Sequence, residues 1–239
     1  MIDPAALRAR LAGVRDRIAR AAGRAGRDPA SIRLVAVSKT FQAEYVRAAA
    51  SAGQVDFGEN KVQEALQKMA QTSDLQIKWH LVGHLQSNKA HKAGGRFDVI
   101  HSIDESSLIL KIDEAAQAVG RQVQLLAQVD LAGEPTKHSA REGELPTMFE
   151  AARGCGAARL SGLMLLPPAT ENPEEARRYF RELRALRARL LARGVDESML
   201  RELSMGMSHD FEVAIEEGAT LIRIGTAIFG NRALNGDDT

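Results

Sequence analysis

Eight short strand-like runs recur along the chain, and a segment with helical periodicity separates each run from the next. The runs cover 32–37, 55–57, 77–82, 97–103, 123–129, 160–165, 202–205 and 220–224. The helical patterns cover 42–52, 60–71, 87–93, 105–119, 141–153, 173–193 and 208–217. The first run, 32–37, is rich in apolar and β-branched residues, which is typical of a strand buried on both faces, and helix-length crossovers indicate parallel pairing. The alternation therefore predicts an α/β fold, a closed (β/α)₈ TIM barrel, with an open doubly wound sheet as the structural alternative.

A further helix precedes the first run. Asp3-Pro4 is a helix-start signal, and the apolar residues that follow recur at steps of four, three and four. These residues are Leu7, Leu11, Val14 and Ile18. Since they share one face, we expect residues 1–27 to be a helical extension packed on the barrel. Barrels commonly use a chain of this length as one unit, so residues 1–239 are predicted to form a single domain.

The charge balance and cysteine content exclude several classes of protein. The chain has 32 basic and 31 acidic residues, a formal net charge of +1, so no strong field is available to recruit nucleic acid or anionic lipid. Its single cysteine, Cys155, excludes an internal disulfide framework and suits a reducing compartment. No apolar run approaches the roughly 18 residues of a membrane span. The sequence therefore predicts a cytoplasmic protein that binds neither nucleic acid nor membrane, and we expect a monomer.

The predicted helix over 173–193 is rich in arginine. Its apolar face is predicted to carry Tyr179, Leu183, Leu186 and Leu190. Glutamates are interleaved with the arginines, which favours a solvated, ion-paired face over a stripe that binds nucleic acid.

A lysine stands where the first predicted strand ends, in Val37-Ser38-Lys39-Thr40. Barrel sites are built from the carboxyl ends of strands and the loops that follow them, so Lys39 is expected at the barrel mouth. Partial burial there would disfavour the ammonium form and leave the neutral amine that attacks an aldehyde. A rim lysine in a salt bridge is the structural alternative.

The last predicted strand runs into Arg223-Ile224-Gly225-Thr226. Gly225 allows a ligand to approach the backbone, and Thr226 offers a hydroxyl and an N–H at the start of a helical turn, where anions bind. The loops after the seventh and eighth strands are the usual phosphate site of this fold. Gly225 and Thr226 are thus predicted to contact a phosphate.

The seventh predicted strand ends in two candidate hydroxyls. Ser204 lies at the strand end and is predicted to contact a phosphate oxygen, with a turn hydroxyl as the alternative. Ser208 is interpreted as the N-cap of the following helix, with Asp210 and Glu212 complementing the helix dipole.

Two further polar positions leave alternatives open. Asn60, after the second strand, can contact a phenolic oxygen or ring substituent of a ligand, or can cap the following helix. His80, in the third strand, is either a core histidine or a site residue. The histidines have no compact metal-ligand spacing, so no metal is assigned. The four considered are His80, His84, His91 and His101.

Six stretches, in order through nearly the whole chain, resemble the pyridoxal phosphate homeostasis protein family, single-domain relatives of the alanine racemase barrel. They are Val37-Ser38-Lys39-Thr40, Phe57-Gly58-Glu59-Asn60, His80 to Lys89, Ser161-Gly162-Leu163-Met164, Leu203 to Ser208 and Arg223 to Gly230. The resemblance implies that pyridoxal 5′-phosphate (PLP) is held as an imine to Lys39. It also implies roles for the remaining residues. They are Ser204, Gly225 and Thr226 for the phosphate, Asn60 for a contact to the cofactor and Arg223 for the pyridine nitrogen.

The resemblance favours a PLP carrier over an enzyme. Arginine can only donate to the pyridine nitrogen, which leaves the ring a poorer electron sink. Racemases need a second base, and in the related enzyme a C-terminal β-domain supplies that tyrosine within a dimer, whereas this sequence ends at Thr239. The only tyrosines, Tyr45 and Tyr179, fall inside helical patterns. The expected function is reversible PLP binding that limits free aldehyde and supplies apo PLP-dependent enzymes. A weak amino-acid racemase and a lysine-imine aldolase remain the alternatives.

Overall fold

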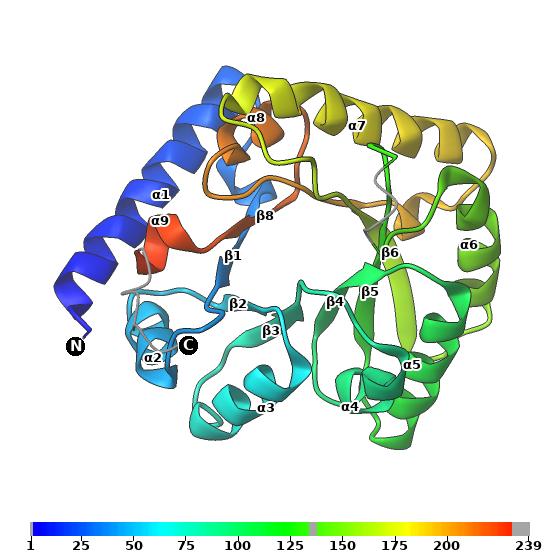
Figure 1. Ribbon diagram of the computed structural model, residues 1–239, viewed down its shortest axis with the longest axis horizontal. Helices are drawn as coiled ribbons and strands as arrows, with labels where there is room; N and C mark the ends of the chain where they lie inside the picture. The colour runs from blue at the N-terminus through cyan, green and yellow to red at the C-terminus, as the bar shows by residue number, and fades with distance from the viewer. Residues whose placement is uncertain (1, 134–137, 231–239) are drawn as a thin grey trace, which may run out of the picture.

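Eight parallel strands close into a barrel in chain order, as the sequence predicts (Figure 1). The computed structural model describes residues 2–133 and 138–230. The outermost bounds of the predicted domain, Met1 and Thr239, lie outside these residues. The strands are β1 (Arg33–Val37), β2 (Asp56–Glu59), β3 (Lys78–Leu81), β4 (Val99–Ile103), β5 (Val123–Gln128), β6 (Ala158–Met164), β7 (Glu202–Ser204) and β8 (Leu221–Ile224). β1 pairs with both β2 and β8, which closes the sheet and excludes the open doubly wound alternative.

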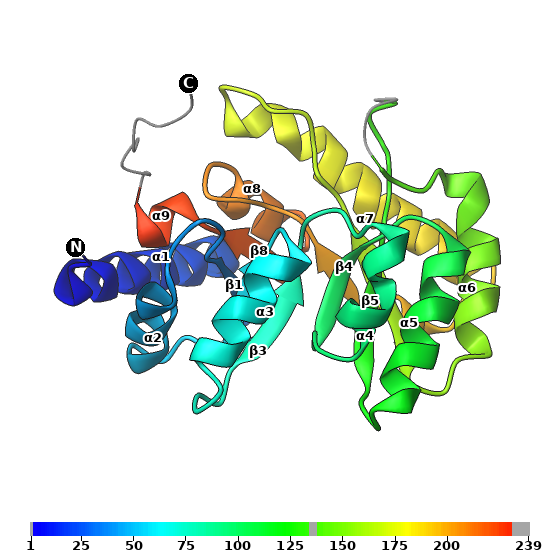
Figure 2. The same cartoon turned by 60° about the horizontal axis from the view of Figure 1, so that its bottom comes forward.

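Helices surround the strands. They are α1 (Pro4–Arg24), α2 (Ala43–Ser51), α3 (Val62–Gln71), α4 (Ala90–Gly94), α5 (Ser106–Ala118), α6 (Leu145–Arg153), α7 (Arg177–Ala192), α8 (Phe211–Glu216) and α9 (Thr226–Phe229). Short 3₁₀ turns cover Pro29–Ser31, Ser87–Lys89, Glu142–Glu144, Pro173–Ala176 and Glu197–Met199. From α2 to α6 the helices follow one another around the outside of the strands in sequence order (Figure 1 and Figure 2). The described part of the chain contains no helix with the length and apolar character needed to cross a lipid bilayer.

The N-terminal helix α1 completes the outer layer where β8 meets β1. The side chain of Asp3 caps it by accepting from the N–H groups of Ala5 and Ala6. Its predicted apolar face is buried against α2, α8 and α9. This placement has a physical reason, because the helix that follows β8 is only the four residues of α9 and leaves the strands beneath it open. The extra N-terminal helix predicted from the sequence is confirmed.

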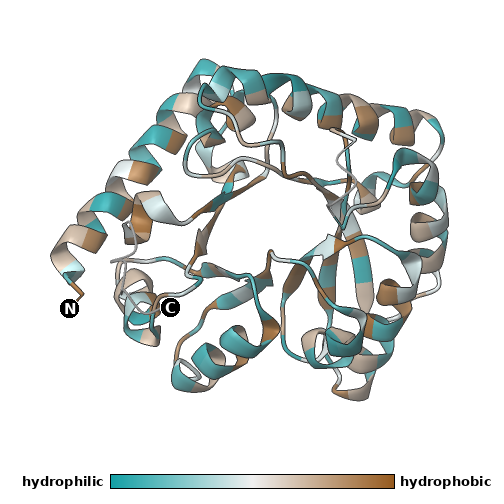
Figure 3. Cartoon of the chain, in the orientation of Figure 1, coloured by the Kyte–Doolittle hydropathy of each residue, from teal (hydrophilic) through white to brown (hydrophobic). Residues whose placement is uncertain are grey.

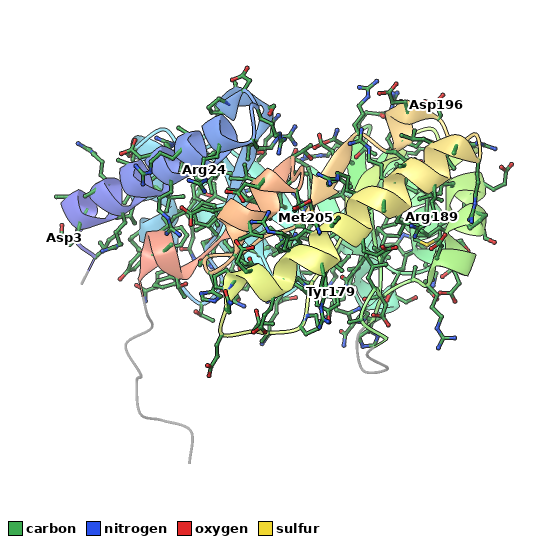
Figure 4. All side chains as sticks on the ribbon, turned by 90° about the horizontal axis from the view of Figure 1, so that it is seen from above. Asp3, Arg24, Tyr179, Arg189, Asp196 and Met205 are labelled. Atoms are coloured by element: carbon green, nitrogen blue, oxygen red, sulfur yellow. The ribbon has the colours of Figure 1, made fainter. Side chains whose placement is uncertain are left out.

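The short helix α8 lies between α1 and α7 on the outer surface, as Figure 4 shows from above. Arginines from both neighbours pair with its glutamates. Arg24 of α1 and Arg177 of α7 both contact Glu216, at 2.8 and 2.7 Å. The predicted start of α8 at residue 208 is too early, since the helix begins at Phe211 after Asp210.

On α7 the buried face differs by one residue from the prediction. Phe180, Leu183, Leu186 and Leu190 are the buried side chains. Tyr179 is only half-buried, and the guanidinium of Arg178 lies 4.7 Å from its ring centre. Hydrophilic and hydrophobic residues alternate along this helix in Figure 3, and its arginines pair with glutamates, as the predicted ion-paired face requires.

Candidate functional site at the barrel mouth

A cavity of about 620 Å³ opens at the carboxyl ends of the strands. Its lining residues lie at or just beyond these ends. They are Val37, Lys39, Asn60, Val82, Gly83, His84, Gln128, His138, Leu166, Met207, Ser208, His209, Arg223, Gly225 and Thr226. A volume of this size is typical of small-molecule sites. The cavity brings together five predicted site residues, which are Lys39, Asn60, Arg223, Gly225 and Thr226, and leaves out Ser204.

Lys39 is the second residue beyond β1. Thr40, the next residue, has a φ of 68° and is the only described residue other than glycine in the left-handed region. Its N–H donates to Glu64 Oε1 at 2.5 Å, which fixes the turn after the lysine. The side chain of Lys39 is exposed, so the partial burial expected from the sequence is not supplied by the fold of the described residues.

Behind Lys39 lies a buried network that the sequence analysis missed. Lys68 Nζ, on α3, donates to Glu59 Oε1 at 2.7 Å, to Glu64 Oε1 at 2.8 Å and to the carbonyl of Ser38 at 2.7 Å. Ser38 Oγ donates to the same oxygen of Glu59 at 2.6 Å. The sequence carried one signal, since Lys68 falls on the buried face of its helix. The network holds the residues on both sides of Lys39, as well as the one before Asn60.

Burial decides the electrostatics of this network. It raises the pKa of the Glu59 carboxyl, and the hydrogen bonds from Lys68 and Ser38 oppose that rise. Burial also acts to raise the pKa of Glu64, but the contacts from Lys68 and from the Thr40 N–H lower it overall. Glu59 Oε2 is buried without a hydrogen-bond partner in the described residues.

Arg223 presents a buried guanidinium to the cavity and is itself 4% exposed. Its Nη1 donates to Ser204 Oγ at 2.6 Å and its Nη2 to the carbonyl of Leu165 at 2.9 Å. Both acceptors are neutral. Burial lowers the pKa of Arg223 to about 10, and the nearby Asp210 opposes this shift. A cation held only by neutral groups favours an anion or a lone-pair acceptor in the cavity.

The structure places the two hydroxyls of this region, Ser204 at the end of β7 and Ser208 beyond it, differently from the prediction. Ser204 is fully buried, because its register partner on β8 is Leu221, two residues below Arg223. Ser208 lines the cavity, and its Oγ accepts from Gly225 N at 3.2 Å and Ala227 N at 3.4 Å. It is not the N-cap of α8, which is Asp210. The missing signal was the stagger between β7 and β8, which a single sequence does not reveal.

His80 belongs to a polar chain inside the barrel. His80 Nε2 lies 2.9 Å from Asp56 Oδ1, and His80 Nδ1 lies 2.9 Å from His101 Nε2. His101 Nδ1 lies 2.8 Å from Ser204 Oγ, which also meets Arg223. Burial lowers the pKa of His80, and lowers that of His101 well below its ordinary value. Both rings are therefore neutral near pH 7. His80 does not line the cavity, so the core reading of this residue is the one the geometry supports.

A second group of histidines lies at the cavity rim. His84, His138 and Asp104 have possible ligand atoms within 4.8 Å of one another. The two rings are stacked, with centres 3.7 Å apart and planes 14° from parallel. The lone pairs of an imidazole lie in the ring plane, so two such rings cannot both point at one ion without turning. We assign no metal to this group.

The two tyrosines lie elsewhere. Tyr45 is on α2, and Tyr179 is on α7 at the outside of the barrel, where Figure 4 labels it. Neither is among the described residues that line the cavity.

The sequence is similar to a known family of proteins. Residues 2–233 match the family described as alanine racemase, N-terminal domain. The pyridoxal phosphate homeostasis protein of Aquifex aeolicus is 43% identical over 223 residues, which cover 93% of this chain and 97% of that protein. The protein of the same name from Pseudomonas aeruginosa is 43% identical over 222 residues, covering 93% and 94%.

Two solved structures are similar to this chain. PipY of Synechococcus elongatus, with PLP bound, is 38% identical and superimposes with a TM-score of 0.82, covering 94% of this chain and all of its own. The alanine racemase of Streptomyces coelicolor, at 22% identity and a TM-score of 0.68, shares the fold. The match covers 97% of this chain and 59% of the racemase chain.

Proposed function

Because the chain belongs to the pyridoxal phosphate homeostasis protein family, built on the alanine racemase N-terminal domain, we propose that it binds PLP reversibly as an imine to Lys39. It acts as a carrier that limits the free reactive aldehyde and supplies PLP to apo-enzymes. The relative whose structure was solved with PLP bound supports this cofactor.

One observation carries the proposal. A primary amine, a buried guanidinium and the glycine-threonine turn after β8 meet in a single cavity, although they come from opposite ends of the sequence. This set matches the functional groups of PLP, which are an aldehyde, a pyridine nitrogen that accepts hydrogen bonds, and a phosphate. The neutral surroundings of Arg223 support the fit, because they leave its charge available to the ligand.

The residues would share the ligand between them. Lys39 takes the aldehyde carbon, Asn60 contacts the ring and Arg223 faces the pyridine nitrogen. Gly225 and Thr226 hold the phosphate. We add Ser208 to this group in place of Ser204, because its hydroxyl lies in the cavity beside the N–H of Gly225.

When bound, PLP supplies an aldehyde that condenses with amines and a ring that accepts electrons. Arg223 works against the second property, since a guanidinium cannot give the ring nitrogen a proton. The exposed position of Lys39 favours the first, because another amine can reach the aldehyde from solvent. Capture and release of PLP therefore suit this site better than racemase chemistry.

The test is the absorbance spectrum of the purified protein with added PLP, beside Lys39→Ala and the matched control Lys61→Ala. Lys61 is exposed and is not part of the cavity lining. We expect the yellow imine band in the wild type and the control, and its loss in Lys39→Ala. A band that survives in Lys39→Ala, or that is absent from the wild type, contradicts the proposal. The protein is also incubated with PLP and L-alanine. Formation of D-alanine at ordinary enzymatic turnover would contradict the carrier function and favour a racemase.

A further inference from the structure

A chain of hydrogen-bonded polar side chains crosses the barrel interior, and the proposed ligand contacts give it no role. It links Arg223, which lines the cavity, to Asp56, the first residue of β2, near the opposite end of the barrel. We call the members Asp56, His80, His101 and Ser204 the Asp56 relay. The two histidines and Ser204 are at most 1% exposed, whereas the Asp56 side chain is 14% exposed. Three hydrogen bonds of 2.8 to 2.9 Å join the four members, and a fourth of 2.6 Å joins Ser204 to Arg223.

The chemistry of the end groups fixes the direction of every bond. Arg223 can only donate, so Ser204 Oγ accepts from it and donates its own proton to His101 Nδ1. The remaining proton of the neutral His101 is then on Nε2 and is donated to His80 Nδ1. The proton of the neutral His80 is likewise on Nε2 and is donated to the carboxylate of Asp56. Ser204, His101 and His80 thus each donate one hydrogen bond and accept one along the relay, and Asp56 accepts at its end.

This direction matters because it connects two opposite charges. Arg223 is buried without a carboxylate among its hydrogen-bond partners, and Asp56 lies at the far end of the relay. Aligned hydrogen bonds polarise one another in a low-dielectric interior. Ser204 Oγ therefore becomes a stronger acceptor for Arg223 than an isolated serine would be.

We propose that the Asp56 relay is a positioning device, which holds the guanidinium of Arg223 in the orientation that meets the ring of a ligand in the cavity. Its members are positioning residues, since they act on the ligand only through Arg223. The effect on PLP rests on the proposed function. The direction of the hydrogen bonds belongs to the protein alone and can be tested without PLP.

The first measurement is ¹⁵N NMR of the histidine side chains in the protein without PLP. The relay predicts that both His80 and His101 are neutral and protonated on Nε2, with His101 and His80 assigned by substitution. A charged ring, or a His101 with its proton on Nδ1, overturns the proposal.

The second measurement is the affinity for PLP and the absorbance maximum of the complex in three variants. Asp56→Asn keeps an oxygen that accepts from His80 and removes only the charge. His101→Gln keeps one donor and one acceptor, and His101→Leu keeps neither. His91→Gln, at an exposed position on α4, is the matched control.

We expect His101→Leu to bind PLP roughly tenfold more weakly with a shifted maximum, the size expected when a buried group loses its partner. His101→Gln should restore most of this affinity, Asp56→Asn should lie between the two, and the control should match the wild type. A wild type that binds PLP while Asp56→Asn and His101→Leu match it in affinity and spectrum overturns the relay alone. A wild type that binds no PLP overturns the proposed function, and the NMR result then decides the relay.

Discussion

At the scale of single residues, the ionisable groups behind Lys39 are the most sensitive part of the molecule. Glu59 is fully buried, and Lys68 is 5% exposed. Lys68 contacts Oε1 of Glu59, whereas Oε2 has no hydrogen-bond partner in the described residues. A buried charge that loses its partner destabilises a protein far more than the intact pair stabilises it.

Lys68→Met is therefore expected to lower the free energy of unfolding by about 3–5 kcal/mol, because it leaves Glu59 buried without its ammonium partner. It also frees the carbonyl of Ser38, next to Lys39. Urea unfolding of the variant measures the loss. The matched control is Lys61→Met at an exposed position, where a change of about 0.5 kcal/mol or less is expected. A loss under about 1 kcal/mol in Lys68→Met would show that the network does not stabilise the fold.

Residue types alone could predict only part of the site. Lys39, Asn60, Gly225 and Thr226 were predicted from their places after strands and Arg223 from the family resemblance, and the cavity gathers all five. The depths of Ser204 and Ser208 could not be predicted, although the first was expected at the phosphate and the second as an N-cap. Their depth depends on the stagger of β7 against β8, which is a property of the closed sheet and not of either strand.

At the scale of elements, the strands were easier to predict than the helix boundaries. All eight predicted runs coincide with strands to within about two residues, because the strands are short and rich in buried apolar residues. Helix starts depend on local caps instead. α3 begins at Val62 and not at residue 60, and α8 begins at Phe211 and not at residue 208. The face of α7 was assigned to Tyr179 where the structure buries Phe180, since two adjacent aromatics fit the periodicity almost equally well.

At the scale of the whole molecule, two histidines inside the barrel make the folding stability depend on pH. His80 and His101 are neutral in the folded protein because burial lowers their pKa, whereas in the unfolded chain they titrate near 6.5. Charged groups around them are Asp56, Asp98, Arg33 and Arg223. Below pH 6.5 the unfolded chain binds protons that the folded protein does not, so stability is full above this pH and is lost as the pH falls.

The free energy of unfolding should fall by up to about 1.4 kcal/mol per pH unit for each of these histidines below pH 6.5. Glu59 acts in the opposite direction above pH 4.5, since burial raises its pKa. Comparison with His101→Gln isolates the contribution of one histidine. Urea unfolding at about pH 5.5, 6.5 and 7.5 gives the slope of the free energy of unfolding against pH for each protein. Equal slopes in the wild type and the variant would mean that His101 is not held neutral by the fold.

The proposed function depends most on the bond between Lys39 and the aldehyde of PLP, and reduction with borohydride followed by peptide mapping tests that bond directly. The account predicts that wild-type protein incubated with PLP and then reduced carries the pyridoxyl phosphate group on the peptide that contains Lys39. A group found on another lysine, with Lys39 unmodified, would contradict it.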